Sequence, residues 1–187
     1  MEIDKIEDYP LKTYYTLWYH GVIDKNWELD SYKCVGKIYS LKDFWIYYNK
    51  IDAFTRGIFF LMKEDLKPVW ETPGNIDGGY WPFRIPHEKV EETWIKLSIS
   101  LITDNIRNKE EEDIKIENNI PHDINGISIS PKPTGAVIKI WNNISKYNEN
   151  KYISPIKDML ILDQVCYRAH KRHKNVLFNE KNKNNNK

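Results

Sequence analysis

The sequence predicts one α+β domain, and two observations lead to this prediction. The chain has 187 residues with 41% hydrophobic content, which is enough to bury one core and too little for two domains of ordinary size. Short segments rich in aromatic and branched residues alternate with longer segments in which apolar residues recur every three or four positions. Several arrangements of strands and helices fit this alternation, and periodicity alone does not choose among them.

Strands are expected where aromatic and branched residues mix with polar ones, because such segments suit half-buried positions in a sheet. The expected strands are 14–20, 32–39, 57–63, 79–85, 126–130, 136–141 and 160–167. Segment 68–77, between two of these strands, is rich in Pro, Gly and Asn and is therefore predicted to form an ordered loop. Trp18, Trp81 and Trp141 fall within expected strands and are assigned to the core.

Three helices are expected from apolar residues at helical spacing. The first covers 41–51, where Ser40 followed by Asp43 resembles a capping box. The second opens at Pro86 and continues to about residue 102. Its apolar stripe comprises Val90, Trp94, Leu97 and Leu101. A third helix is expected within 143–159, although Pro155 is unfavourable inside a helix.

The polarity of the chain divides it into a domain and its flanking segments. We expect a flexible N-terminus at 1–8, a single domain at 9–178 and a disordered C-terminal tail at 179–187. Residues 104–125 are too polar for a core and are predicted to form a surface insertion in the domain.

Composition excludes several classes of function. The 28 basic residues are balanced by 27 acidic ones, so no uniform positive field attracts nucleic acid through its phosphates alone. Cys34, Cys166 and the five histidines follow no metal-ligand spacing, and no nucleophile–base pair is evident. The sequence shows neither a signal peptide nor a long apolar stretch, which predicts a cytoplasmic protein. The missing metal-ligand and catalytic patterns predict a binding protein without cofactor or metal, and not an enzyme.

Two motifs resemble the eukaryotic translation initiation factor 4E family. They are "LKDFWIYYNKI" at 41–51 and "KPVWETPGNIDGGYW" at 67–81, and weaker correspondences extend over about residues 9–170. The resemblance implies a curved antiparallel sheet of about eight strands, with three helices packed on its convex face. It also implies a slot on the concave face for the 7-methylguanosine cap of messenger RNA.

The resemblance implies that Trp27 and Trp70 stack on the two sides of the methylated guanine, and that Glu71 binds the edge of the base. The chemistry suits the ligand, because N7-methylation makes guanine cationic and indole faces attract cations. A carboxylate can accept hydrogen bonds from both the N1–H and the exocyclic amine of guanine.

Phosphate recognition departs from the family pattern. Lys132 matches one of the family's basic positions, whereas Thr134, Val137 and Tyr80 occupy others and carry no positive charge. The cluster expected to compensate consists of Arg168, Lys171, Arg172 and Lys174. The alternative interpretation of this cluster is a solvated basic tail.

A second, partner-binding surface is implied on the helical face, where the family receives a short motif with a tyrosine and a leucine. The matching positions are Tyr9, Pro10, Leu41, Trp45, Ile95 and Ile99. Lys96 replaces the family's usual acidic residue there. The leading hypothesis is a protein that recruits capped messenger RNA to a scaffold protein for translation initiation. The alternatives are a repressor of the same fold with weak cap affinity, and an adaptor that binds only protein.

Overall fold

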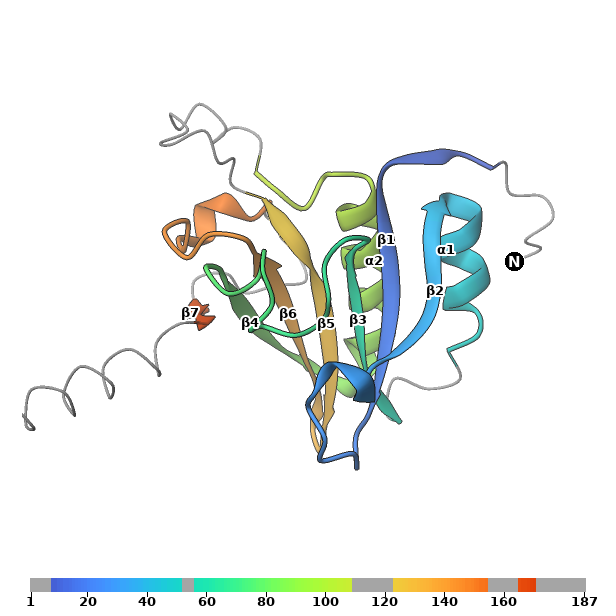
Figure 1. Cartoon of the computed structure of the whole chain (residues 1–187), viewed down its shortest axis with the longest axis horizontal. Helices are drawn as coiled ribbons and strands as arrows, with labels where there is room; N and C mark the ends of the chain where they lie inside the picture. Colours follow the sequence, from blue (N-terminus) through green and yellow to red (C-terminus); the bar gives the residue numbers. More distant parts are fainter. Residues whose placement is uncertain (1–7, 52–55, 109–122, 155–164, 171–187) are drawn as a thin grey trace, which may run out of the picture.

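The computed structural model describes residues 8–51, 56–108, 123–154 and 165–170, and these residues form a curved antiparallel sheet with helices on one face (Figure 1). The sheet has seven strands in the order β2-β1-β3-β5-β6-β4-β7. The strands are β1 Pro10–Gly21, β2 Lys33–Ser40, β3 Gly57–Lys63, β4 Gly79–Pro86, β5 Ile124–Lys132, β6 Gly135–Asn142 and β7 Arg168–Ala169. The α-helices are α1 Leu41–Tyr48 and α2 Val90–Ile102. Three short 3-10 helices are η2 Leu29–Ser31, η3 His87–Lys89 and η6 Asn150–Tyr152.

The main core lies between the sheet and the two helices. Alternate residues along each strand face the helices, as the period of two in a strand requires. In β6, for example, Ala136, Ile138 and Ile140 belong to this core. Trp94 and Leu97 of α2 are almost fully buried against it. This large apolar layer supplies the burial that stabilises the domain.

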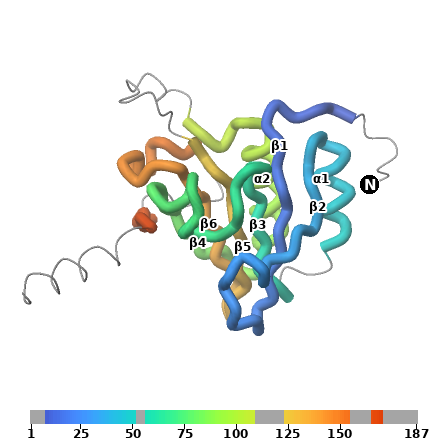
Figure 2. The backbone as a smooth tube through the Cα atoms, viewed as in Figure 1, coloured from blue at the N-terminus to red at the C-terminus, as the bar shows by residue number. Residues whose placement is uncertain are grey.

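The two helices lie side by side on the same face of the sheet, with α1 next to β2 and α2 behind β1 and β3 (Figures 1 and 2). The predicted capping box is confirmed: the amide of Asp43 donates to Ser40 Oγ at 3.2 Å, and the amide of Ser40 donates to Asp43 Oδ2 at 3.1 Å. Tyr48 of α1 donates to Glu91 Oε1 of α2 at 3.0 Å, which joins the two helices.

The opposite face of the sheet carries a second, smaller apolar cluster. Its buried members are Phe60, Met62 and Trp141. Half-buried residues pack against them: Trp18, Tyr32, Ile58, Leu66, Trp70 and Tyr80. This cluster is rich in aromatic rings, and among the described residues loops cover it, so it offers ring faces rather than a closed core.

The predicted element count was partly wrong. The described residues form seven strands and two α-helices, where about eight strands and three helices were expected. In the expected third helix, residues 143–154 form turns and the short helix η6, and residues 155–159 lie outside the described residues. Asn142, just before this segment, donates to the carbonyls of Ile144 and Tyr147 at 2.9 Å each, which holds the chain in turns. The last strand is Arg168–Ala169 instead of 160–167, of which 160–164 is not described.

Both edges of the segment predicted as a polar insertion, 104–125, contain buried residues. Ile106 and Ile124 are each 1% exposed and Asn125 is 3% exposed, so both edges of the segment belong to the folded domain. Ile124 and Asn125 start β5. The middle of the segment, 109–122, and the predicted tail at 179–187 lie outside the described residues, as does all but Asp8 of the predicted flexible N-terminus.

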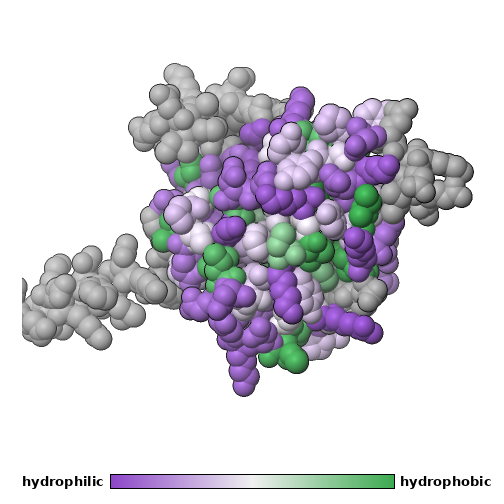
Figure 3. Space-filling view, turned by 45° about the vertical axis from the view of Figure 1, so that its right-hand side comes forward, coloured by the Kyte–Doolittle hydropathy of each residue, from purple (hydrophilic) through white to green (hydrophobic). Residues whose placement is uncertain are grey.

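The described surface is mixed. On the face seen in Figure 3, small hydrophobic patches are separated by hydrophilic side chains. The large apolar side chains that are most exposed include Ile23 at 93% and Trp27 at 53%. None of the described helices has the length and apolar character needed to cross a membrane.

Candidate functional site

Two loops cover the aromatic cluster on the face of the sheet opposite the helices. The loop from β1 to β2 carries Trp27, and the loop from β3 to β4 carries Trp70 and Glu71 (Figure 1). As predicted, both tryptophans lie in loops: Trp27 is exposed and Trp70 is half-buried. The site is therefore built from loops that a rigid sheet holds in place.

Trp27 stacks on His20, a fully buried residue of β1. The two ring centroids are 4.3 Å apart and the planes differ by 9°. His20 Nε2 lies 2.7 Å from the carbonyl oxygen of Asn26, so this nitrogen carries the proton and donates it. Tyr32 packs against the same imidazole at 4.9 Å. One face of Trp27 is thus occupied by protein, and stacking on a ligand is left to the other.

Local hydrogen bonds shape the loop around Trp27. The amide of Asn26 donates to Asp24 Oδ1 at 2.9 Å, and the amide of Glu28 donates to Asn26 Oδ1 at 2.9 Å. The Asn26 amide group also donates to Asp30 Oδ1 at 3.0 Å. These are Asx-type turns between near neighbours in an exposed loop.

Buried asparagines connect the loop that carries Trp70 to the sheet through hydrogen bonds. Asn75 is fully buried, and its Nδ2 donates to the carbonyls of Lys67 at 2.8 Å and Val69 at 3.0 Å. Its Oδ1 accepts from Asn125 Nδ2 of β5 at 2.8 Å. Gly74, with φ of 89°, supplies the left-handed turn in front of it. Trp70 is therefore carried by a loop tied to a central strand.

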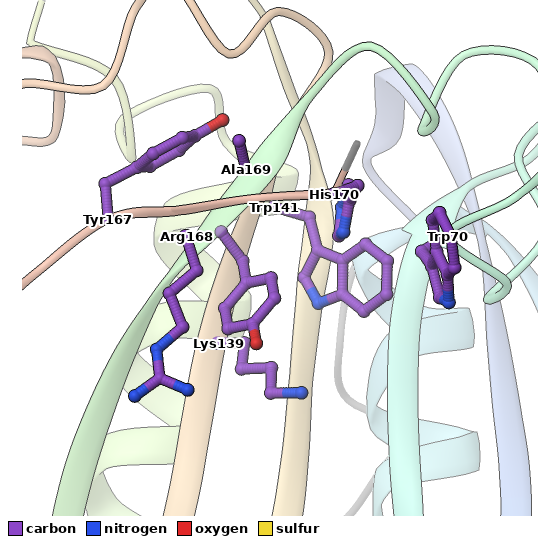
Figure 4. A pocket seen from close by; sticks show the side chains of 8 residues that line it. Trp70, Lys139, Trp141, Tyr167, Arg168, Ala169 and His170 are labelled. Atoms are coloured by element: carbon purple, nitrogen blue, oxygen red, sulfur yellow. The ribbon is translucent and has the colours of Figure 1, made fainter. Parts of the chain in front are cut away.

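A cavity of about 440 Å³ opens beside Trp70 (Figure 4). We call it the aromatic cavity, and its lining residues are Trp70, Tyr80, Lys139, Trp141, Tyr167, Arg168, Ala169 and His170. Trp141 is fixed in place because its Nε1 donates to Ser128 Oγ at 3.0 Å. The cavity thus presents several aromatic rings together with two cationic side chains.

The short strand β7 brings Arg168 and His170 to this cavity. Asn142, which is fully buried, accepts from Tyr167 Oη at 2.7 Å and from the amide of Gly79 at 3.0 Å. β7 pairs with the start of β4, and the amide of His170 donates to the carbonyl of Gly78 at 3.0 Å. Asn142, at the end of β6, therefore positions Tyr167 next to β7.

His170 lies among three aromatic rings. Its imidazole is 6.1 Å from Trp70, 5.0 Å from Trp141 and 5.6 Å from Tyr80, between ring centroids. Burial, and secondarily the charge of Lys139, lowers the pKa of His170 to about 4. The imidazole is consequently neutral near pH 7.

Three buried polar atoms on this side of the sheet have no hydrogen-bond partner among the described residues: Trp18 Nε1, His20 Nδ1 and His170 Nε2. Trp81 Nε1 and Ser98 Oγ share this property in the main core. The described residues contain no group of three or more His, Cys, Asp or Glu side chains that could hold a metal ion.

Two cations, Lys139 and Arg168, line the aromatic cavity, and the charge of Lys132 also acts on Lys139. Burial, followed by the charges of Lys132 and Arg168, lowers the pKa of Lys139 below its usual range. Lys139 Nζ also lies 4.4 Å from the centroid of the Tyr80 ring. Such a cluster attracts anions. Of the predicted phosphate-binding residues, Lys132 and Arg168 lie near it, whereas Lys171, Arg172 and Lys174 lie outside the described residues.

Glu71 is exposed next to Trp70. Burial, and secondarily the charge of Glu71, raises the pKa of Tyr32 to about 12. Tyr32 packs on His20, which in turn lies behind Trp27. Among the described ring pairs, Trp27 and Trp70 each stack on a histidine and not on each other.

The predicted partner-binding residues lie on the helical side. The amide of Leu41 donates to the carbonyl of Tyr9 at 3.0 Å, so the exposed residues Tyr9 and Pro10 adjoin the start of α1. Trp45 is half-buried against Phe44 and Tyr48. Ile95 and Ile99 are half-buried on α2. Beside them Lys96 forms an ion pair with Glu92 at 2.7 Å, so its charge is partly balanced within the helix.

Several residues of the site were not predicted from the sequence. His20 stacks on Trp27, and Lys139 and His170 line the aromatic cavity beside Trp70, but none of the three was assigned to the site. Trp141 was assigned to the core; it is 5% exposed and yet lines the cavity. Trp81 is fully buried in the core as predicted, whereas Trp18 is half-buried in the smaller cluster. Alternation in β6 was the available signal, because Lys139 and Trp141 share one face of the strand.

Comparison with known proteins identifies relatives. The family model "Eukaryotic initiation factor 4E" matches residues 10–187. Eukaryotic translation initiation factor 4E of Eremothecium gossypii is 25% identical over 164 residues, which cover 83% of this chain and 72% of the relative. Eukaryotic translation initiation factor 4E-1 of Caenorhabditis elegans is 25% identical over 180 residues, 91% of this chain and 77% of the relative.

Solved structures share the fold. A complex of C. elegans eIF4E-3 with the 4E-binding protein Mextli and a cap analog has a TM-score of 0.67 and 23% identity. The match covers 88% of this chain and 94% of that one. Ascaris suum eIF4E-3 in complex with the m2,2,7G cap has a TM-score of 0.61 and 24% identity, with 75% and 77% covered.

Proposed function

The chain belongs to the eukaryotic initiation factor 4E family, and we propose that it binds the 7-methylguanosine cap of messenger RNA and recruits the capped RNA for translation initiation. The observation that carries this proposal is the pairing of two tryptophan loops over an aromatic face of the sheet, with Glu71 beside Trp70. Solved structures of the same fold are complexes with cap and cap analogs.

In this proposal the methylated base stacks on Trp70 and on the exposed face of Trp27. Stacking contributes about 1–3 kcal/mol per base on an aromatic side chain, and the positive charge of the methylated ring adds a cation–π attraction. Glu71 accepts hydrogen bonds from the N1–H and the amine of the guanine. Adenine presents a different edge to this carboxylate and is rejected.

The phosphate chain of the cap is proposed to bind along the cations near the aromatic cavity. Lys132, Lys139 and Arg168 interact there, and Val137, Thr134 and Tyr80 add no charge. Attraction to exposed cations is screened by salt, so this part of the affinity depends on ionic strength. Lys171, Arg172 and Lys174 remain predicted contributors.

Fluorescence titration with cap analogs tests this function. Trp70→Ala and Glu71→Ala are each expected to weaken binding of 7-methylguanosine triphosphate by at least about tenfold, since each removes a major contact to the base. Trp45→Ala on the helical face is the matched control and should keep the wild-type affinity. Equal affinities in folded Trp70→Ala and wild-type proteins would exclude the proposed slot.

The helical face is proposed to bind a scaffold or regulatory protein. Tyr9 and Pro10, with Leu41 and Trp45 of α1 and the isoleucines of α2, present apolar surface there, and a solved structure of the same fold carries the 4E-binding protein Mextli. Trp45→Ala should abolish capture of such a partner by the folded protein, while Trp70→Ala should not affect it. Partner capture at wild-type strength by Trp45→Ala would contradict this assignment.

A translational repressor with weak cap affinity is the second candidate. It is favoured by the uncharged residues Tyr80, Thr134 and Val137 at positions where the family resemblance implies phosphate contacts, and by Lys96 next to the helical surface. Addition of the protein to a cap-dependent translation reaction separates the two functions. Stimulation of a factor-depleted reaction supports initiation, whereas inhibition of a complete reaction supports repression.

A further inference from the structure

Lys139 is placed where a cation acts on both parts of a bound cap. It lies on β6 two residues before Trp141, so both side chains project from the same face of the strand. Lys139 lines the aromatic cavity together with Trp70 and Trp141, and its Nζ lies over the ring of Tyr80 (Figure 4). Any flat ligand seated on these rings is close to this charge.

Within the part of the chain that the structure describes, no carboxylate forms an ion pair with Lys139. Some other lysines do form ion pairs: Lys37 with Glu64, Lys63 with Asp123, Lys96 with Glu92 and Lys151 with Glu149. The charged groups that act on Lys139 in the described residues are instead two further cations, Lys132 and Arg168. In Figure 4 the side chains of Lys139 and Arg168 extend in the same direction, below Trp141 as drawn.

We propose that Lys139 sets the balance between base and phosphate in this slot, weakening the preference for a cationic base and strengthening the attraction of the phosphates. The inference rests on the proposed cap-binding function. A half-buried ammonium repels a second cation more strongly than it would in water, because the local dielectric constant is lower. The same ammonium attracts the phosphate chain. Affinity in this slot therefore depends more on the phosphates, and less on methylation of the base, than it would in a slot without Lys139.

Lys139→Met tests the proposal, because methionine keeps the length and apolar stem of lysine but removes the charge. Affinities are measured for 7-methylguanosine and guanosine, and for the monophosphate and triphosphate of 7-methylguanosine, at a pH where the methylated base keeps its N1 proton. The preference for 7-methylguanosine over guanosine should rise by about fivefold or more. The advantage of triphosphate over monophosphate should fall by a similar factor.

Two matched variants distinguish position from net charge. Lys139→Arg keeps the charge and should preserve both ratios. Lys132→Met removes an exposed charge at the end of β5, and should lower the triphosphate advantage without changing the preference for the methylated nucleoside. If Lys132→Met and Lys139→Met change the methyl preference equally, the effect belongs to net charge and the assignment of Lys139 is wrong.

The wild-type protein gives a test that needs no folded variant. Added salt should weaken binding of the triphosphate, which the cations attract, more than binding of 7-methylguanosine. A triphosphate advantage that does not fall with salt, or an unchanged methyl preference in folded Lys139→Met, would overturn the proposal. If Trp70→Ala also binds cap like wild type, the proposed function itself fails; if Trp70→Ala loses binding, only the role of Lys139 is rejected.

Discussion

The loops that carry Trp27 and Trp70 are held in different ways. Asn75 and Asn125 tie the Trp70 loop to a central strand through buried side chains 50 positions apart in the chain. The Trp27 loop has exposed hydrogen bonds between residues two to four positions apart, and His20 of β1 both stacks on Trp27 and donates to the carbonyl of Asn26 at 2.7 Å. The first loop is thus anchored to a central strand by buried amide groups, and the second by hydrogen bonds within the loop and by one residue of β1.

This difference assigns the two loops different parts in binding. Opening the Trp70 loop requires breaking buried hydrogen bonds, so its ring is pre-organised and binding incurs little additional ordering. The Trp27 loop is held less firmly, because all of its residues from Val22 to Asp30 are exposed and its contacts with the sheet are made to one buried residue, His20. We infer that the base first stacks on Trp70 and that Trp27 then closes over it.

The largest effect is expected from Asn75→Ala. It removes the hydrogen bonds to Lys67, Val69 and Asn125 and leaves their buried polar groups unpaired. We expect a loss of about 2–4 kcal/mol in the free energy of unfolding, together with a clear loss of cap affinity. Denaturant unfolding and fluorescence titration measure the two quantities.

Asn26→Ala is the corresponding change in the Trp27 loop. It removes the side-chain hydrogen bonds to Asp30 and to the amide of Glu28, but these groups are exposed and can bind water instead. The expected change in unfolding free energy is below about 1 kcal/mol. Equal losses in Asn75→Ala and Asn26→Ala would show that the two loops are held alike.

A smaller effect is expected from His20→Ala, which removes the ring behind Trp27. Aromatic pairs contribute about 0.5–1.5 kcal/mol beyond their buried area, so cap affinity should fall by roughly five- to tenfold as Trp27 loses its support. His20→Phe retains a ring and should bind nearly as wild type. His87→Ala, at an exposed histidine near the turn from β5 to β6, is the control. If His20→Phe is as defective as His20→Ala, the hydrogen bond to Asn26 and not the stack supports the loop.

Sequence reasoning found the parts of the site that lie in recognisable motifs. Trp70 and Glu71 fall in a conspicuous loop, and the structure shows them on that loop. His20 and His170 were missed because their contacts join β1 to a following loop and β7 to β4. Such contacts depend on strand register, which spacing along the chain does not specify. Lys139 and Trp141 were not assigned to the site because β6 carries no motif that marks its outer face, where Val137 and Lys139 are half-buried.

The same limit applies to the fold. α1 and α2 were predicted well because capping and apolar periodicity are local signals. The prediction of a third helix was wrong over 143–154. There the side chain of Asn142 donates hydrogen bonds to two carbonyl groups of the turn that follows. Edges of the polar segment were also misjudged, since Ile106 is buried by contacts with distant residues.

The smallest predicted effect is an acid sensitivity that belongs to the Trp70 side of the site. Burial and the charge of Lys139 lower the pKa of His170 from 6.5 to about 4, so the unfolded chain binds more protons than the folded one between these values. Stability is therefore complete above about pH 6.5, falls as the pH decreases and changes no further through this group below about pH 4. Because the imidazole is only partly buried, we expect a loss on the order of 1 kcal/mol.

Thermal unfolding of wild type and His170→Gln across this range isolates the contribution, with His87→Gln as control. Parallel pH profiles for wild type and His170→Gln would show that His170 is not held neutral among Trp70, Tyr80 and Trp141, and would remove this distinction between the two tryptophan loops.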